Sequence, residues 1–227
     1  MSNHDHTTRG PLPRRLFDRS RAVLREQGAA ALWFKTLGEL GYRRMTLFES
    51  QPGEQDYQAP DAPLELAWLT PAEVDRFCLF RRTTPRQLVL DRLSSGRRCL
   101  IARTQDEFVY ATWLATENAW IDYLGVGLNL PANYVYQYEA YVHPRFRKRG
   151  YGSWIGRERR RMLADEGRSR TLAALMPENR AGEGLIRAAG FRQVGMLRRF
   201  KIGSVSQAWL SGAPGISIEN LPVSRRL

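Results

Sequence analysis

Residues 144–152 of this 227-residue chain place a proline, four cations and two glycines between a strand-like and a helix-like segment. Pro144 ends the strand because proline has no backbone N–H for a sheet. Gly150 and Gly152 let successive N–H groups point into one concavity, and the helix expected behind them adds free N–H groups and a positive dipole end. The cations are Arg145, Arg147, Lys148 and Arg149. The pattern predicts a site for a pyrophosphate, although a glycine turn before a helix with a solvated basic face would have the same sequence.

Three tyrosines alternate in the segment before this loop. Tyr134, Tyr136 and Tyr138 therefore share one face of the predicted strand. If that face lines a cleft, the rings and hydroxyls, together with Trp113 and Trp120, would suit a sugar or another flat polar ligand. The alternative is that the rings pack across neighbouring strands beneath a helix.

The elements that must position these residues alternate between strands and helices. Capping boxes with proline begin helices at Thr70-Pro71-Ala72-Glu73 and at Thr84-Pro85-Arg86-Gln87. Strands are expected at 64–69, 98–104, 107–115, 133–142 and 171–176, with an apolar stretch at 119–129 and a strand pair at 192–202; helices are expected from 71, from 84 to 96, and at 151–166 and 180–189. This order predicts a mixed α+β sheet and not a doubly wound one.

Two markers within this order resemble the GNAT acetyltransferase superfamily. The acyl-CoA signature of that family is Arg/Gln-x-x-Gly-x-Gly/Ala after a strand that ends in Val-x-Pro. Here Arg147-Lys148-Arg149-Gly150-Tyr151-Gly152 follows Val142-His143-Pro144. The second marker is an asparagine that ends the next strand, followed by a short helix closing in Gly-Phe, which are Asn179 and Gly190-Phe191 here. The resemblance covers about residues 64–205 and implies a GNAT-like, mostly antiparallel central sheet flanked by helices.

The resemblance also implies acetyl-CoA as the acyl donor, with no metal. The pyrophosphate would lie on the loop amides, and the pantetheine arm on the splayed end of the strand and on the asparagine. The cofactor-binding residues expected on this basis are Ala140, Tyr141, Val142, Arg147, Lys148, Arg149, Gly150, Tyr151, Gly152 and Asn179. An amide aimed at the thioester carbonyl would stabilise an oxyanion. Asn179 is equally suited to be a helix N-cap, and both roles can coexist.

Ile186 departs from the family pattern, because many members carry a tyrosine there that protonates the departing thiolate. Its absence leaves the general acid to water or another hydroxyl, or leaves a chain that binds acyl-CoA without turning it over. Glu139, the only carboxylate on the long strand, is the expected catalytic base or amine-binding group, and an ion pair with a nearby arginine is the alternative. Asp122 is the second candidate base. Tyr136 and Tyr138 are the expected acceptor-binding residues.

Composition divides the chain into four parts. The expected divisions are a basic helical N-terminal annex at 1–49, a proline-containing linker at 50–63, the GNAT-like domain at 64–205 and a C-terminal tail at 206–227. Amphipathic helices are expected at 14–27 and about 30–37. Residues 14–40 are predicted either to contact a membrane surface or a partner, or to pack on the main domain with solvated arginines.

The net charge and the scarcity of cysteine and histidine limit the classes of protein and of site that the chain can represent. The chain has 35 cations against 23 acids, a formal charge of +12, and only three of the cations are lysine. Arginine favours planar anions such as phosphate, and a GC-rich genome would give the same skew. Two cysteines and three histidines disfavour a disulfide framework, a zinc site and a Ser-His-Asp triad. No apolar run approaches the roughly 18 residues of a membrane span, and we expect a cytoplasmic protein.

We therefore expect an acyl-CoA-dependent N-acyltransferase that uses acetyl-CoA and acts on the amine of a small molecule, such as an amino sugar or a polysaccharide precursor. One alternative is acetylation of a protein or peptide amine, against which the +12 charge argues. Another is a non-catalytic acyl-CoA-binding protein, which Ile186 keeps open. Nucleic-acid binding is not expected, because no reading motif is present. A homodimer is also compatible with the sequence.

Overall fold

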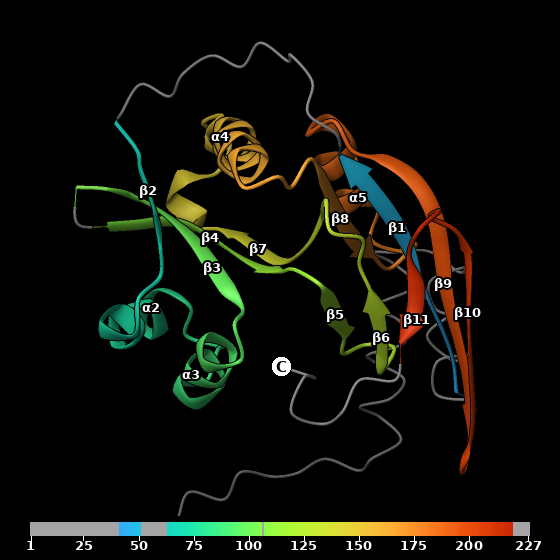
Figure 1. Ribbon diagram of the computed structural model, residues 1–227. Helices are drawn as coiled ribbons and strands as arrows, with labels where there is room; N and C mark the ends of the chain where they lie inside the picture. Colours follow the sequence, from blue (N-terminus) through green and yellow to red (C-terminus); the bar gives the residue numbers. More distant parts are fainter. Residues whose placement is uncertain (1–40, 51–62, 106, 220–227) are drawn as a thin grey trace, which may run out of the picture.

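The computed structural model describes residues 41–50, 63–105 and 107–219 (Figure 1). The strands are β1 (Tyr42–Ser50), β2 (Glu65–Trp68), β3 (Arg98–Thr104), β4 (Glu107–Ala115), β5 (Asn118–Ile121), β6 (Val126–Asn129), β7 (Tyr134–Val142), β8 (Arg170–Leu175), β9 (Arg192–Ile202), β10 (Val205–Gly212) and β11 (Ser217–Glu219). The helices are α2 (Val74–Phe80), α3 (Arg86–Ser94), α4 (Tyr151–Asp165) and α5 (Arg180–Ala188), with 3-10 turns η1 (Pro71–Glu73) and η2 (Pro144–Phe146).

Eight of these strands form one sheet in the order β10-β9-β1-β8-β7-β4-β3-β2. Neighbouring strands in it are antiparallel except β7 and β8, which run parallel. Strands β11, β6 and β5 form a second, antiparallel sheet. The predicted α+β class with a mixed, mostly antiparallel central sheet flanked by helices is confirmed.

Helices cover both faces of the large sheet (Figure 1). On one face, Ile155 and Leu163 of α4 join two apolar clusters with strand residues, and Ile186 of α5 packs against a third. On the other face, Phe77 of α2 and Val89 of α3 belong to one buried cluster. The small sheet contributes to the largest cluster, which lies against β1, β7, β8 and β9. The two markers of the sequence, the loop before α4 and the N-terminus of α5, thus belong to elements held on the same face.

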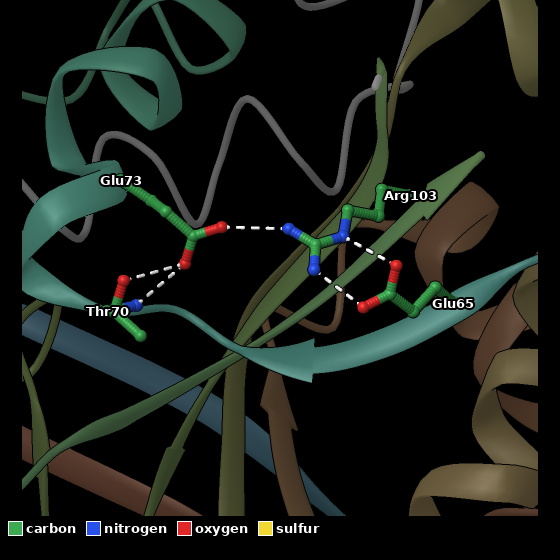
Figure 2. A network of polar contacts seen from close by, with 4 residues as sticks. All are labelled: Glu65, Thr70, Glu73 and Arg103. Atoms are coloured by element: carbon green, nitrogen blue, oxygen red, sulfur yellow. Dashed lines mark hydrogen bonds and ion pairs between the residues drawn. The ribbon is translucent and has the colours of Figure 1, made fainter. Parts of the chain in front are cut away.

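The first capping box is formed, and it is tied to the sheet. The Glu73 carboxylate accepts hydrogen bonds from the N–H and the hydroxyl of Thr70 at 3.1 and 2.8 Å. Figure 2 shows that the other oxygen of Glu73 meets Arg103 of β3, which also makes a two-pronged contact with Glu65 of β2. The cap therefore joins the start of the helical region to the β2–β3 edge, where the sequence predicted only a helix start.

Residues 42–50 differ from the sequence prediction. They were expected within the helical annex up to residue 49, but they form β1 in the centre of the large sheet, between β8 and β9. Residues 46–50 are buried, and Leu47 belongs to the largest core cluster. The reason is that both partner strands come from the far end of the chain, so the local pattern carries no sign of the pairing.

The end of the chain differs as well. Residues 206–212, expected in the tail, lie in β10 and pair with β9, and residues 217–219 pair with β6. The predicted helices at 14–27 and 30–37 and most of the predicted linker lie outside the described residues. Among the helices that the structure describes, none has the length and apolar character needed to cross a bilayer.

Candidate functional site

Strands β7 and β8 separate halfway along β7. Their parallel pairing runs only as far as Gln137 opposite Ala173. Just beyond, β7 has a bulge against β4 where the register shifts past Thr112, and Glu139 adopts a positive φ of 50°. The β8-facing backbone edge of residues 140–142 is therefore left without a strand partner. The predicted cofactor-binding residues Ala140, Tyr141 and Val142 lie at this edge.

The loop that follows β7 has open space in front of its amides. Lys148 and Gly150 have φ values of 62° and 74°. These values lie in the left-handed region, which explains the glycine at position 150. A Cβ atom added at Gly150 or Gly152 would meet nothing within 4 Å. The N–H groups of Tyr151 and Gly152 open α4 and have no intrahelical acceptor. Amides, free space and the positive helix end converge here, so the loop fits a phosphate group.

The cations of this loop are exposed and surround that space. Arg145 forms an ion pair with Glu107 at 3.0 Å. Arg147 donates from Nε to the carbonyl oxygen of Val142 at 3.1 Å, which holds the side chain beside the end of β7. Within the described part of the chain, neither Arg147, Lys148 nor Arg149 has a carboxylate partner. Three charges thus remain to neutralise a bound anion.

Glu139 is held by a buried arginine. Arg92 of α3 donates to its two carboxylate oxygens at 2.8 and 2.7 Å. The Arg92 side chain is 4% exposed and its guanidinium lies 5.2 Å from the ring centres of both Trp113 and Tyr138, whereas the Glu139 side chain is 36% exposed. The ion pair that the sequence left as an alternative is present, and one side of the carboxylate still faces water.

A second carboxylate belongs to the same electrostatic neighbourhood. Asp122 follows β5, and partial burial of its carboxyl raises its pKa above the ordinary value. The positive charge of Arg92 and a hydrogen bond with Trp120 act against the rise, and the negative charge of Glu139 adds to it. Asp122 as a whole residue remains exposed. It is therefore an accessible carboxylate with an increased affinity for a proton.

The three alternating tyrosines do not share one role. Tyr134 is buried and donates a 2.6 Å hydrogen bond to Glu49 of β1, so it serves the core. Tyr136 and Tyr138 stack with ring centres 5.7 Å apart, and Tyr138 stacks on Trp113 at 6.4 Å. Burial raises the pKa of both hydroxyls, and the Tyr138 oxygen has no hydrogen-bond partner among the described residues.

The second marker forms as predicted, at the start of α5. Asn179 is the N-cap of that helix, and its Oδ1 accepts a hydrogen bond from the N–H of Gly182 at 2.9 Å. The residue is exposed, which leaves its amide nitrogen accessible. Ile186 packs into the apolar cluster with Phe48 and Phe191. The position where many relatives of the motif carry a tyrosine therefore points into the core.

Arg92 is the residue that the sequence did not reveal. It lies in the predicted helix from 84 to 96, but its partner Glu139 is 47 positions further along the chain. An arginine among many others on a helix carries no signal of its own. Only the expectation that one face of that helix is buried could have suggested that Arg92 needs a partner.

Comparisons with known proteins support the fold. No protein-family model matches the chain, and no curated protein matches it. A GNAT-family acetyltransferase from Colwellia psychrerythraea is similar with a TM-score of 0.52 and 12% identity, over 85% of this chain and 75% of that one. The GCN5-related glucosamine N-acetyltransferase region of a fungal multi-domain GH3 β-N-acetylglucosaminidase is similar with a TM-score of 0.50 and 14% identity, over 75% of this chain and 22% of that one.

At these identities the likeness is one of fold. The chain has the fold of the GNAT acetyltransferases, as the motif resemblance implied. A functionally unknown conserved protein from Staphylococcus epidermidis also matches, with a TM-score of 0.47 and 12% identity over 73% of this chain. This chain spans 64% of that protein's length.

Proposed function

We propose that this protein is an acyl-CoA-dependent N-acetyltransferase. The observation that carries the proposal is the combination of a splayed β7–β8 pair with an open, cationic amide loop at the start of α4. The two features lie at opposite ends of residues 140–152, so one elongated ligand with a diphosphate can reach both. The GNAT fold adds support, since acetyl-CoA is the donor that the family motif implies.

Each predicted cofactor residue has a place in this proposal. The amides from Arg147 to Gly152 would hold the diphosphate, with Arg147, Lys148 and Arg149 supplying charge. The free edge of residues 140–142 would bind the pantetheine arm, and an N–H there would stabilise negative charge on the thioester oxygen. Asn179 would contact the arm through its amide nitrogen. Bound acetyl-CoA supplies an activated acetyl thioester, and such a reaction is expected in the cytoplasm.

We assign the two carboxylates different roles in the attack by an amine. An acceptor amine arrives as an ammonium and must lose a proton before it can attack. Asp122 would take up that proton, since partial burial raises the pKa of its carboxyl. Glu139, held by Arg92, would bind the ammonium with its exposed side. The thiolate leaving group is tolerable without a dedicated acid, because a thiol titrates near ~8.5.

For the acceptor we propose a small-molecule amine, such as an amino sugar or a polysaccharide precursor. Tyr138 is half-buried next to Arg92 and would contact the acceptor, while Tyr136 and Trp113 are buried and hold its ring by stacking. The proposal is in line with the glucosamine N-acetyltransferase activity stated for the fungal region. The other candidate is a non-catalytic acyl-CoA-binding protein, which the core position of Ile186 favours.

Thermal unfolding with acetyl-CoA tests the donor. A ligand present at one hundred times its dissociation constant stabilises the folded state by about 2.7 kcal/mol. For a chain of this size that raises the melting temperature by about 5–11 °C. Free CoA should stabilise as well, and ATP less. Absence of any shift would refute the proposed cofactor site.

A matched pair of variants locates the binding. Gly150→Glu places a negative charge in the loop and should weaken acetyl-CoA binding roughly tenfold or more. Gly167→Glu is the control, because Gly167 has nearly the same φ, 78°, and equally open space, but lies at the other end of α4. Equal affinities in the two variants would remove the loop from the site. Release of the CoA thiol from acetyl-CoA in the presence of amino sugars would then distinguish an acetyltransferase from a protein that only binds acyl-CoA.

A further inference from the structure

Exposed apolar side chains gather on the β9–β10 hairpin. Phe200, Ile202, Val205 and Trp209 are 37%, 59%, 67% and 42% exposed. We call these four residues the hairpin patch. Ile202 pairs with Val205, and the alternation along each strand places Phe200 and Trp209 on the same face as that pair. The opposite face of the hairpin is different, since Leu197 belongs to the largest core cluster and Leu210 packs against it.

The hairpin reaches beyond the rest of the sheet. Among the described residues, the pairing of β9 with β1 ends at Phe200 opposite Tyr42 and is followed by the hydrogen bond from Lys201 N–H to the Gly41 carbonyl. The remaining residues form a turn at Gly203, whose φ is 55°, and Figure 1 shows the tip of the hairpin well past the start of β1. The patch is therefore carried on a projecting element.

The order of side chains along the hairpin resembles the depth order of a membrane interface. Two aliphatic residues, Ile202 and Val205, stand opposite each other at the tip. Phe200 follows, and then Trp209 opposite Arg198. In proteins that bind bilayers, aliphatic side chains lie deepest, aromatic rings lie at the boundary, and arginines meet the headgroups.

The charge of the hairpin suits an anionic surface. Residues 192–212 contain four cations, Arg192, Arg198, Arg199 and Lys201, and no aspartate or glutamate. Arg198 lies on the face of the patch, and Lys201 is exposed next to the tip on the opposite face. Apolar residues with cations and no acids favour anionic lipids over neutral ones. A second copy of this chain would bring the same cations against one another, which disfavours it as the occupant.

We infer that the hairpin patch docks on an anionic lipid bilayer, with Ile202 and Val205 inserted and Arg198 at the headgroups. This contact does not depend on the proposed transferase activity. It places a peripheral membrane surface on described residues, separate from the one predicted for residues 14–40.

Vesicle sedimentation tests the contact with the full chain. The protein should pellet with vesicles of phosphatidylcholine and phosphatidylglycerol, more weakly at high salt, and not with phosphatidylcholine alone. The double variant Ile202→Ser/Val205→Ser should weaken this binding roughly 30-fold or more, because two largely exposed aliphatic side chains no longer leave water. Leu79→Ser/Leu185→Ser is the control, since both leucines are 75% exposed and lie outside the patch. It should bind like the unaltered chain.

A fluorescent label provides a second measurement that does not depend on the stability of the double variant. Ser204→Cys in a Cys78→Ser background offers one reactive thiol at the hairpin tip, because Cys99 is buried. An environment-sensitive dye there should shift to the blue with anionic vesicles. Pelleting without a blue shift would mean that another surface, such as residues 14–40, makes the contact, and would overturn the inference. Equal vesicle binding by the Ile202/Val205 variant, or a dimer that this variant dissociates without any vesicle binding, would overturn it too.

Discussion

Replacing Glu139 by glutamine should destabilise the protein through the arginine beneath it. The Arg92 guanidinium is almost fully buried and has two hydrogen bonds to Glu139. Removing the negative charge leaves that cation without its counter-ion, which costs about 3–5 kcal/mol in a fully buried pair. Because the Glu139 side chain is 36% exposed, water screens part of the effect, and about 2 kcal/mol is the more suitable figure. The melting temperature should fall by about 4–8 °C.

A double-mutant cycle separates this charge effect from packing. In Arg92→Met/Glu139→Gln the buried cation is gone, and the methionine can fill the space between Trp113 and Tyr138. The double variant should therefore regain most of the lost stability, to within about 1 kcal/mol of the original chain. Urea unfolding of the four proteins measures the coupling. Additive losses, or a Glu139→Gln variant as stable as the original, would refute the argument that Arg92 depends on this carboxylate.

Four further predictions concern three other sites with buried or partly buried groups. Asp122→Asn should be more stable than the original chain at neutral pH. Because the pKa of Asp122 is raised in the folded state, the original chain loses stability as the pH rises through the range in which the carboxyl ionises. The asparagine variant does not have this loss, so the two free energies of unfolding should become equal in acid. The same variant should lose about 10²–10⁴-fold in kcat/KM if Asp122 is the base, and an unchanged pH–rate profile would exclude it. Arg159→Met should be neutral or stabilising by about 1 kcal/mol or more in urea unfolding, because burial lowers the pKa of Arg159 and its contact with Tyr110 brings no negative charge; a loss above about 2 kcal/mol would show a hidden counter-ion. A thiol reagent should modify Cys78 in the folded protein and Cys99 only after unfolding, because burial strongly raises the pKa of the Cys99 thiol, and mass spectrometry would detect the order.

The elements with local signals were predictable from the sequence. The loop before α4 and the N-cap of α5 depend on glycine, proline and asparagine at short spacing, and both have the predicted form. The first capping box is present for the same reason. The roles of the predicted site residues were harder to predict from the sequence. Glu139 could be placed on a strand, but whether it is paired or free depends on a helix almost fifty residues earlier.

Local sequence therefore determined the fold class of this protein: the glycine-containing loop before α4, the Asn179 cap and the order of strands and helices resemble the GNAT pattern, and the structure has that fold. Tertiary structure decided what lies beside what. Strand β1 is central because it pairs with β8 on one side and β9 on the other. Its partners depend on burial of both faces of the sheet, and its own residue pattern does not specify them. The same is true of the hairpin patch, since nothing in the local sequence distinguishes Ile202 and Trp209 from buried strand residues, and the fold leaves them 59% and 42% exposed. Pairings between distant segments depend on which surfaces remain unburied, and no short stretch of sequence contains that information.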